Sequence, residues 1–547
     1  MKKIIFALSV ITLIAACNNN GKNTTNSDSD DESKTASEKK ITKRDFTITA
    51  ANAYNDLFFD SLALVNFISE NKIDESLGRR MRSFYNARNY QYAWFSTDGA
   101  GEQARGFWNM HNYHNTYSND TTLKDKALQK KMDDLMAEDS LRISSTDKSI
   151  LNTELKLTRD FILYALNNIE DGYVKRKEME KFIPLRKSDA LGLADSLIAK
   201  KHKDNKYYED VNESYKKLKE QLVKYVAIAK NGGWPVITAS AKQLKKGASL
   251  PVIGLIKKRL QLTADMPGQD TTLLFSDALE QAIKNFQVRH GYTATGIITD
   301  GQIKDMNVPV LVRVQQILMN MGRMQWMINE PQGKLMLVNI PEFILHVKEA
   351  NKKVFDMNVV VGKEGHNTTM FTGNLNQIVF SPYWNVPVSI VKKEILPGIE
   401  RNPGYLASHE MEITGTNGGL PVVRQLPGAQ NSLGKVKFLF PNSFDIYFHD
   451  TPAKSLFEKD KRAYSHGCIR LSEPAKLAEY LLKDDAAWTP EKIDEAMNSG
   501  NEQFVKVKKP VPVLITYYTA WVDDNGQLHF ADDIYGHDAE LASKTFF

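Results

Sequence analysis

The chain has 547 residues, of which 42% are hydrophobic and 25% are charged, and its 71 basic and 66 acidic side chains give a formal net charge of +5. This length is too great for a single core and predicts two to four domains, while the composition is typical of a soluble globular protein. The near balance of charges gives no reason to expect a nucleic-acid partner, although a mildly basic surface would suit an anionic polymer.

The first residues predict export. Lys2 and Lys3 precede a run of thirteen apolar residues, 4–16, which is too short to span a bilayer as a helix. Small residues then stand directly before Cys17, as in a bacterial lipobox, where cleavage exposes a cysteine that receives lipid. A plain signal peptide cut after Ala16 and a buried apolar segment are the alternatives.

We therefore expect residues 1–16 to be a lipoprotein signal peptide and Cys17 to carry the lipid that anchors the protein in the cell envelope, on the periplasmic face. Asn18 is not the acidic residue associated with retention in the inner membrane of some bacteria, so the outer membrane is preferred. Residues 17–45 are polar and contain no aromatic side chain, which predicts a flexible tether. No later stretch is long and apolar enough to predict a transmembrane helix.

Residues 46–235 predict a mostly α-helical scaffold domain. Apolar residues recur at three-to-four spacing over 51–68 and 154–167, and a further helix is predicted over 213–229. The aromatic run 84–95 is interpreted as core and domain contact, with a carbohydrate-binding platform as the alternative.

Residues 247–308 predict a separate module of three helices. The second helix is predicted to start at Asp277, where Asp277 and Glu280 form a capping-box pattern, and the third to open at Thr299 with Gln302 three positions on.

Two segments of this module, 282–287 and 290–292, resemble the peptidoglycan-binding module found beside many wall enzymes. The resemblance implies a peptidoglycan partner, and a purely structural three-helix linker is the alternative.

A linking helix is predicted within 309–334, and residues 335–515 predict a β-rich, β-sandwich-like domain. Short runs of apolar residues alternate with turn residues, and they predict strands over 335–340, 343–347, 354–361, 377–381, 436–440 and 444–448. An irregular insertion at 389–432 is long enough to cap a cleft. A short helix is predicted over 472–482, and residues 516–547 are expected to form a polar C-terminal tail.

The chemistry is predicted to centre on Cys468, the single free thiol left if Cys17 is lipidated. An exported protein that keeps an unpaired thiol in an oxidising compartment is expected to use it. A thiol attacks as thiolate and needs a nearby base, and His449, nineteen positions earlier at the end of a predicted strand, is the natural candidate. Its orienting group is either a backbone carbonyl near Asp450 or the Asp450 carboxylate.

The residues around the thiol have matching roles. Gly467 permits close backbone approach, so the N–H groups of Gly467 and Cys468 are candidates for an oxyanion hole. Arg470 has the donor geometry to bind a substrate carboxylate.

Three other interpretations of this cluster are the alternatives. His449, His466 and Cys468 could be zinc ligands, but no carboxylate motif of zinc hydrolases accompanies them. A papain-like arrangement would place the essential histidine well after the cysteine, and here only His529 and His537 follow it. The third interpretation is an inert buried cysteine.

His449, then fifteen residues, then Ser465-His466-Gly467-Cys468 with Arg470 resembles the signature of YkuD-type L,D-transpeptidases. Further similarity lies in Val361-Gly-Lys363, Thr369, 382–387, Ser389-Ile390, Pro397, Tyr405-Leu406, Arg424-Gln425, Pro427-Gly428 and, upstream, in 84–95, 232–235 and 323–326. This layout resembles the large, multidomain, YcbB-like subgroup.

The resemblance implies that Cys468 attacks a tetrapeptide stem, releases D-alanine and passes the acyl group from a thioester to a neighbouring stem, making a 3→3 cross-link. It implies His449 as proton shuttle, and Ser465, His466 and Arg470 as residues that shape the site and hold substrate. Tyr383, Trp384 and Asn385 would line the cleft. It implies no cofactor, no metal, and acylation by carbapenems. An L,D-carboxypeptidase, a transpeptidase that attaches proteins to the wall, and a non-enzymatic wall-binding lipoprotein are the alternatives.

Overall fold

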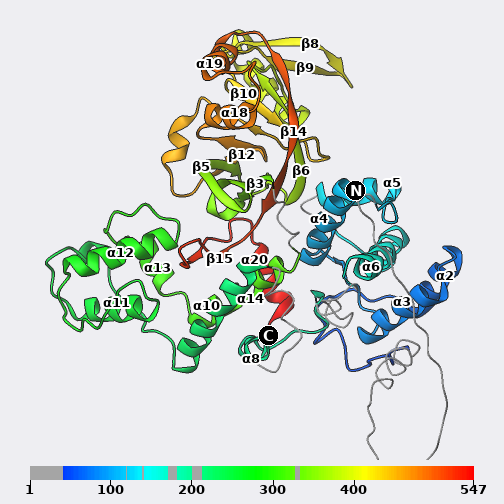
Figure 1. Ribbon diagram of the computed structural model, residues 1–547, viewed down its shortest axis with the longest axis vertical. Helices are drawn as coiled ribbons and strands as arrows, with labels where there is room; N and C mark the ends of the chain where they lie inside the picture. Colours follow the sequence, from blue (N-terminus) through cyan, green and yellow to red (C-terminus); the bar gives the residue numbers. More distant parts are fainter. Residues whose placement is uncertain (1–40, 119, 138–140, 170–181, 200–211, 327–332) are drawn as a thin grey trace, which may run out of the picture.

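The computed structural model describes residues 41–118, 120–137, 141–169, 182–199, 212–326 and 333–547 (Figure 1). The predicted signal peptide, Cys17 and nearly all of the predicted tether lie outside these residues. Within the described ranges, no helix combines the length and the apolar character needed to cross a bilayer. The chain forms a helical N-terminal part followed by a β-rich domain, as predicted.

The scaffold consists of helices around one large hydrophobic core. They are α2 (Ser61–Glu70), α3 (Glu75–Ala87), α4 (Glu102–Tyr117), α5 (Lys126–Ala137), α6 (Lys148–Ile169), α8 (Ala190–Ile198) and α10 (Glu213–Lys230), with a two-stranded pair, β1 (Phe95–Ser96) and β2 (Gly99–Ala100). The helix predicted over 51–68 is wrong in its first half, because the Asp60 side chain caps α2 by accepting the Leu62 N–H.

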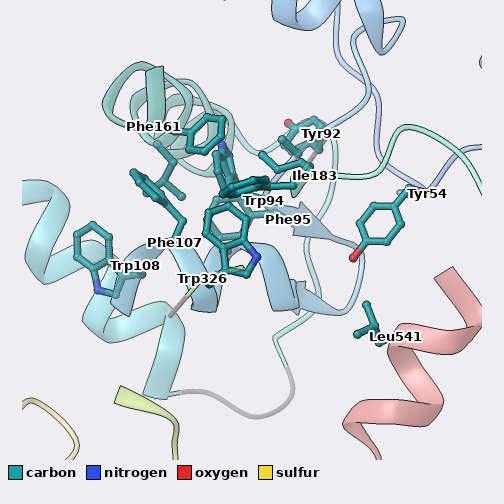
Figure 2. Close-up of a cluster of buried hydrophobic side chains, with 14 of the residues drawn as sticks. Tyr54, Tyr92, Trp94, Phe95, Phe107, Trp108, Phe161, Ile183, Trp326 and Leu541 are labelled. Carbon is teal, nitrogen blue, oxygen red and sulfur yellow. The ribbon is translucent and has the colours of Figure 1, made fainter. Parts of the chain in front are cut away.

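The aromatic run 84–95 is core, as predicted, and not a carbohydrate platform. Tyr92, Trp94 and Phe95 have no exposed surface, and Figure 2 shows them gathered with other buried rings. Trp326, which follows the linking helix α14 (Val310–Met324), enters the same cluster 6.4 Å from Trp94. The aromatic run therefore joins the scaffold to the segment that leads into the β-rich domain.

The three-helix module has a hydrophobic core of its own. Its helices are α11 (Pro251–Leu262), α12 (Asp277–Arg289) and α13 (Asp300–Met306). The predicted capping box at Thr299 and Gln302 is confirmed at α13. The one predicted at Asp277 is wrong by a residue, since the Ser276 hydroxyl caps α12.

The described part of the β-rich domain contains a nine-stranded mixed sheet in the order β12-β5-β13-β11-β10-β6-β14-β3-β4. Its strands are β3 (Lys334–Asn339), β4 (Ile344–Glu349), β5 (Lys352–Gly362), β6 (Phe371–Phe380), β10 (Val436–Leu439), β11 (Phe448–His449), β12 (Ala463–Ser465), β13 (Ile469–Leu471) and β14 (Gln503–Thr516). The first part of β5 pairs with β4 and its last part with β13 and β12, so the sheet curls back on itself around a single core. Helices α18 (Pro474–Leu482) and α19 (Pro490–Asn498) pack against that core.

The strand predictions for the β-rich domain need two corrections. The strand predicted over 444–448 is mostly a turn, because Asp445 has a φ of +53° and the Asn442 side chain accepts the Phe444 and Ile446 N–H groups. The long strand β14 was not predicted.

The insertion at 389–432 is regular rather than irregular. It contains α15 (Val388–Ile390), a π-helical turn (Val391–Ile395), α16 (Leu396–Arg401) and α17 (Tyr405–Ser408), and the hairpin β8 (Met411–Asn417)–β9 (Leu420–Gln425), which pairs with β7 (Trp384–Asn385) around a small core.

The predicted C-terminal tail is folded. It forms β15 (Ala520–Val522), β16 (Leu528–Phe530) and α20 (His537–Thr545), and several of its side chains are buried in the scaffold core. In Figure 1, α14, α20 and β15 lie where the scaffold, the three-helix module and the β-rich domain meet. The last residues of the chain therefore connect its parts.

Candidate active site

The register of three neighbouring strands brings the predicted site together. Lys437 of β10 lies opposite His449 of β11, and His449 lies opposite Arg470 of β13. Residues directly across a sheet share a face, so His449 stands between two cationic side chains. Phe448 and Ile469 point into the core on the other face.

Cys468 immediately precedes β13 and continues the strand's alternation of side chains between the two faces of the sheet. Cys468 and Arg470 are half-buried, whereas Ile469 and Leu471 are buried in the core. The thiol therefore lies on the same face as Arg470, diagonally across from the His449 ring.

His449 is suited to act as a neutral base. Its side chain is buried, and Nδ1–H donates to the backbone carbonyl of Asp450 at 2.5 Å, which leaves Nε2 as the acceptor. Of the two orienting groups considered from the sequence, the structure has the carbonyl. Burial, reinforced by the positive charge of Arg470, lowers the pKa of His449 to about 3, so the ring is neutral at physiological pH.

The Cys468 thiol is neutral as well. Its surroundings raise the pKa of the thiol to about 11, chiefly by desolvation, although hydrogen bonding from Tyr447 and the charge of Arg470 act in the opposite direction. The sulfur lies 3.5 Å from the Asp445 carbonyl. In the resting site the thiol and the imidazole are therefore both uncharged, and the recorded contact of the sulfur is with the Asp445 carbonyl.

The turn that carries the nucleophile is held by Ser465. Its buried hydroxyl donates to the Cys468 carbonyl at 2.5 Å and accepts the Gly467 N–H at 3.1 Å. Gly467 has a φ of +114°, which a residue with a Cβ adopts only with strain. The Gly467 N–H predicted to serve an oxyanion hole is thus already donated, and an oxyanion would have to displace Ser465 to receive it. Ser465, predicted to hold substrate, is committed to this turn.

His466 and Arg470 lie two residues before and two residues after Cys468. His466 Nε2 lies 3.2 Å from Glu394 of the insertion, which links the nucleophile turn to the insertion. Burial lowers the pKa of His466, against the raising effect of Glu394. The Nε atom of Arg470 is buried with no hydrogen-bond partner among the described residues, so its N–H is an unused donor.

Tyr383, Trp384 and Asn385 support the insertion. Trp384 packs against the insertion core, Asn385 is exposed, and the Arg424 guanidinium lies 4.2 Å from the centre of the Tyr383 ring. No contact between these three side chains and Cys468 is found in the described structure. Their connection to the site runs through Lys437, whose ammonium lies 3.4 Å from the Tyr383 carbonyl.

Sequence reasoning missed Lys437, Tyr447 and Thr368. Lys437 flanks His449 only through strand register, which cannot be read from the chain. Tyr447 stands two residues before His449, and this spacing would have placed both on one face. Thr368 donates to the Gly467 carbonyl at 2.7 Å from a loop a hundred residues away, without any local signal.

In the described residues, no three or more His, Cys, Asp or Glu side chains are grouped to hold a metal ion. A cavity of about 70 Å³ lies between α4, α14, β6 and β14, and Cys468 is not among its lining residues. The sheet face that carries Cys468 and His449 is therefore separate from this cavity.

Together the fold and the site define a multidomain protein in which a helical scaffold carries a β-rich domain with a thiol beside a neutral histidine. Residues 333–513 match the L,D-transpeptidase catalytic domain of the YkuD family, and residues 79–222 match a scaffold domain. This match of the β-rich domain to the YkuD catalytic-domain model confirms the resemblance read from the sequence.

A Haemophilus influenzae protein named "Putative L,D-transpeptidase" is 30% identical over 243 residues, which are 42% of this chain and 49% of that protein. The matched region thus spans about half the length of this curated relative.

Solved L,D-transpeptidase structures from Mycobacterium smegmatis and Stackebrandtia nassauensis are 16% and 17% identical, with TM-scores of 0.18 and 0.19. They cover 34% and 48% of this chain and 58% and 88% of their own chains. These scores are too low to support a conclusion about this protein.

Proposed function

We propose that this protein is a peptidoglycan L,D-transpeptidase that forms 3→3 cross-links through a Cys468 thioester. The observation that carries the proposal is the placement of a thiol diagonally across from a buried, neutral histidine on one face of a YkuD-type domain. A neutral imidazole with a free Nε2 can take the thiol proton as the sulfur attacks.

The proposed reaction uses His449 four times. Its Nε2 takes the Cys468 proton while the sulfur attacks the carbonyl between the third residue and the terminal D-alanine of a tetrapeptide stem. It returns that proton to the D-alanine nitrogen, so that D-alanine leaves and a thioester remains. The side-chain amine of a second stem then attacks the thioester, His449 takes the amine proton, and the proton returns to the sulfur as the new amide forms. No cofactor is needed for this sequence.

Substrate contacts are proposed from charge and position. Arg470 would bind a stem carboxylate, because the Nε of its half-buried side chain is an unused donor. His466, tied to Glu394 of the insertion, would contact substrate between the nucleophile turn and the insertion, and Tyr383, Trp384 and Asn385 would border the cleft from the same side.

The location and the wall partner are also proposals. Lipidation at Cys17 would hold the protein in the outer membrane facing the periplasm, where stem peptides lie, and the 247–308 module would bind peptidoglycan. Cys17→Ala should release the protein from washed membranes and deletion of the module should lower sacculus binding. If Cys17→Ala stays in the membrane fraction, the proposed lipid anchor is refuted. If deletion of the module leaves sacculus binding unchanged, the proposed peptidoglycan-binding role of the module is refuted.

The test incubates the purified protein with disaccharide-tetrapeptide and separates the products. Wild type should give 3→3 dimers and free D-alanine, and Cys468→Ala should give neither. Tyr480→Phe, which removes one hydroxyl on α18 in the same domain, is the matched control. Tripeptide without dimers would identify an L,D-carboxypeptidase, and transfer to a labelled protein amine alone would identify wall attachment. Sacculus binding without any turnover would identify a structural lipoprotein.

A further inference from the structure

The catalytic turn is held by a residue beyond the family-matched domain. Tyr535, in the turn before α20, donates its hydroxyl hydrogen to the Gly362 carbonyl at 2.6 Å and accepts the Thr368 N–H at 3.2 Å. The buried Thr368 hydroxyl accepts the Gly362 N–H at 2.9 Å and donates to the Gly467 carbonyl at 2.7 Å. Two side chains thus connect the C-terminal segment to the residue before the nucleophile.

The hydrogen bond from Thr368 to the Gly467 carbonyl also affects the nucleophile. The peptide that joins Gly467 and Cys468 is planar and trans, so its N–H points away from its C=O. Because Thr368 fixes the Gly467 carbonyl, it also fixes the direction of the Cys468 N–H. The Gly467 N–H is already donated to Ser465, so the Cys468 N–H is the turn's remaining candidate for stabilising an oxyanion.

The C-terminal segment is itself anchored to the scaffold. The Tyr535 N–H donates to the Tyr517 hydroxyl at 2.9 Å, and the two rings stack 5.7 Å apart. Two residues into α20, Asp538 forms a buried ion pair with Arg323 of α14 at 2.6 Å and accepts the Thr519 hydroxyl. A continuous series of contacts therefore runs from the linking helix to the catalytic turn.

We propose that Thr368 and Tyr535 are positioning residues that aim the Cys468 N–H at the developing oxyanion, and that α14 and α20 hold them in place. This inference rests on the proposed function, because it assigns the oxyanion donor of that reaction. Neither residue touches the reacting atoms, so their loss should lower kcat and leave KM nearly unchanged.

The variants are Thr368→Val, which removes the hydroxyl at nearly constant shape, Thr368→Ser, which keeps it, and Tyr535→Phe. Tyr480→Phe is again the control, since it also removes one tyrosine hydroxyl from the catalytic domain. Two measurements are made on the full-length protein: kcat and KM with tetrapeptide donor, and amide hydrogen exchange in the peptide covering residues 463–471.

We expect Thr368→Val and Tyr535→Phe to lower kcat at least about tenfold with KM within about twofold, and to speed exchange in the 463–471 peptide. Thr368→Ser should restore both values, and Tyr480→Phe should change neither. The inference is overturned if kcat stays at the wild-type value, or if Thr368→Ser fails to restore it while the variants remain folded.

The second measurement separates this inference from the proposed function. If wild type does not turn over the donor, the proposed function fails. The exchange rates then test on their own whether Thr368 and Tyr535 hold the catalytic turn, and equal rates in all variants would refute that role.

Discussion

The resting site is predicted to hold a neutral thiol and a neutral imidazole, and the reactivity of Cys468 tests this directly. The pKa of the thiol is raised from 9.0 to about 11 and that of His449 is lowered from 6.5 to about 3. Both shifts oppose a preformed thiolate–imidazolium pair, because each disfavours the charged form of its group.

The size of the effect follows from these values. At pH 7 a thiol of pKa 9.0 is about 1% ionised, and one of pKa about 11 is about 0.01% ionised, a loss of about 100-fold in thiolate. A more basic thiolate is a better nucleophile, and this raises the rate roughly six- to tenfold, which offsets part of the loss. Cys468 should therefore react with a neutral disulfide reagent about tenfold more slowly than an ordinary thiol at pH 7, and the rate should rise up to about pH 11.

The assay follows thiopyridone release from 4,4′-dithiodipyridine between pH 5 and pH 11, in a Cys17→Ala background in which Cys468 is the only thiol. His449→Gln should leave the profile within about threefold of wild type, because a neutral ring does not stabilise a thiolate. A rate plateau below pH 8 that disappears in His449→Gln would refute the reasoning, since it would reveal an ion pair in the resting site.

Three predictions concern the scaffold. Burial raises the pKa of Glu154 from 4.5 to about 7, so its contribution to stability is complete below about pH 4.5 and is lost as the pH rises through 7. The difference in unfolding free energy between wild type and Glu154→Gln should fall by about 3 kcal/mol over that window, and a constant difference would contradict this. Trp326→Ala should destabilise by about 3–5 kcal/mol in urea unfolding, because it empties a site in the aromatic core; a loss below 1 kcal/mol would refute that role. Gly106→Ala should cost about 1–3 kcal/mol, since its Cβ would lie 2.5 Å from the buried Trp326 ring. Gly322→Ala on α14 should be neutral or stabilising, because a Cβ at this position would meet no atom within 4 Å. Equal losses of stability in both glycine variants would contradict the packing explanation.

Local patterns were sufficient for much of the fold. The helices at 154–167 and 213–229 follow from apolar spacing alone, and the Thr299 capping box is visible in four consecutive residues. The candidate nucleophile and base could also be proposed from the sequence, because their residue types and spacing suggest the chemistry, and their roles stay predictions.

Long-range pairing was not predictable in the same way. The strand β14 contains charged residues and two prolines and shifts register between Lys506 and Val511, so its alternation is broken. The C-terminal residues were expected to form a polar tail because their apolar side chains follow no helical or strand period, and they are buried against the scaffold and the β-rich domain, which precede them in the chain. The same applies to the site, where Lys437 and Tyr535 acquire their positions from register and domain contact.

The measurement that tests the central proposal most directly is the intact mass of the protein after brief exposure to the tetrapeptide donor. A Cys468 thioester predicts a mass increase equal to the donor less D-alanine, present in wild type, absent in Cys468→Ala, and lost when the acceptor amine is added as 3→3 dimers appear. No adduct under conditions that yield products, or an adduct that persists in Cys468→Ala, would contradict acyl transfer through this thiol.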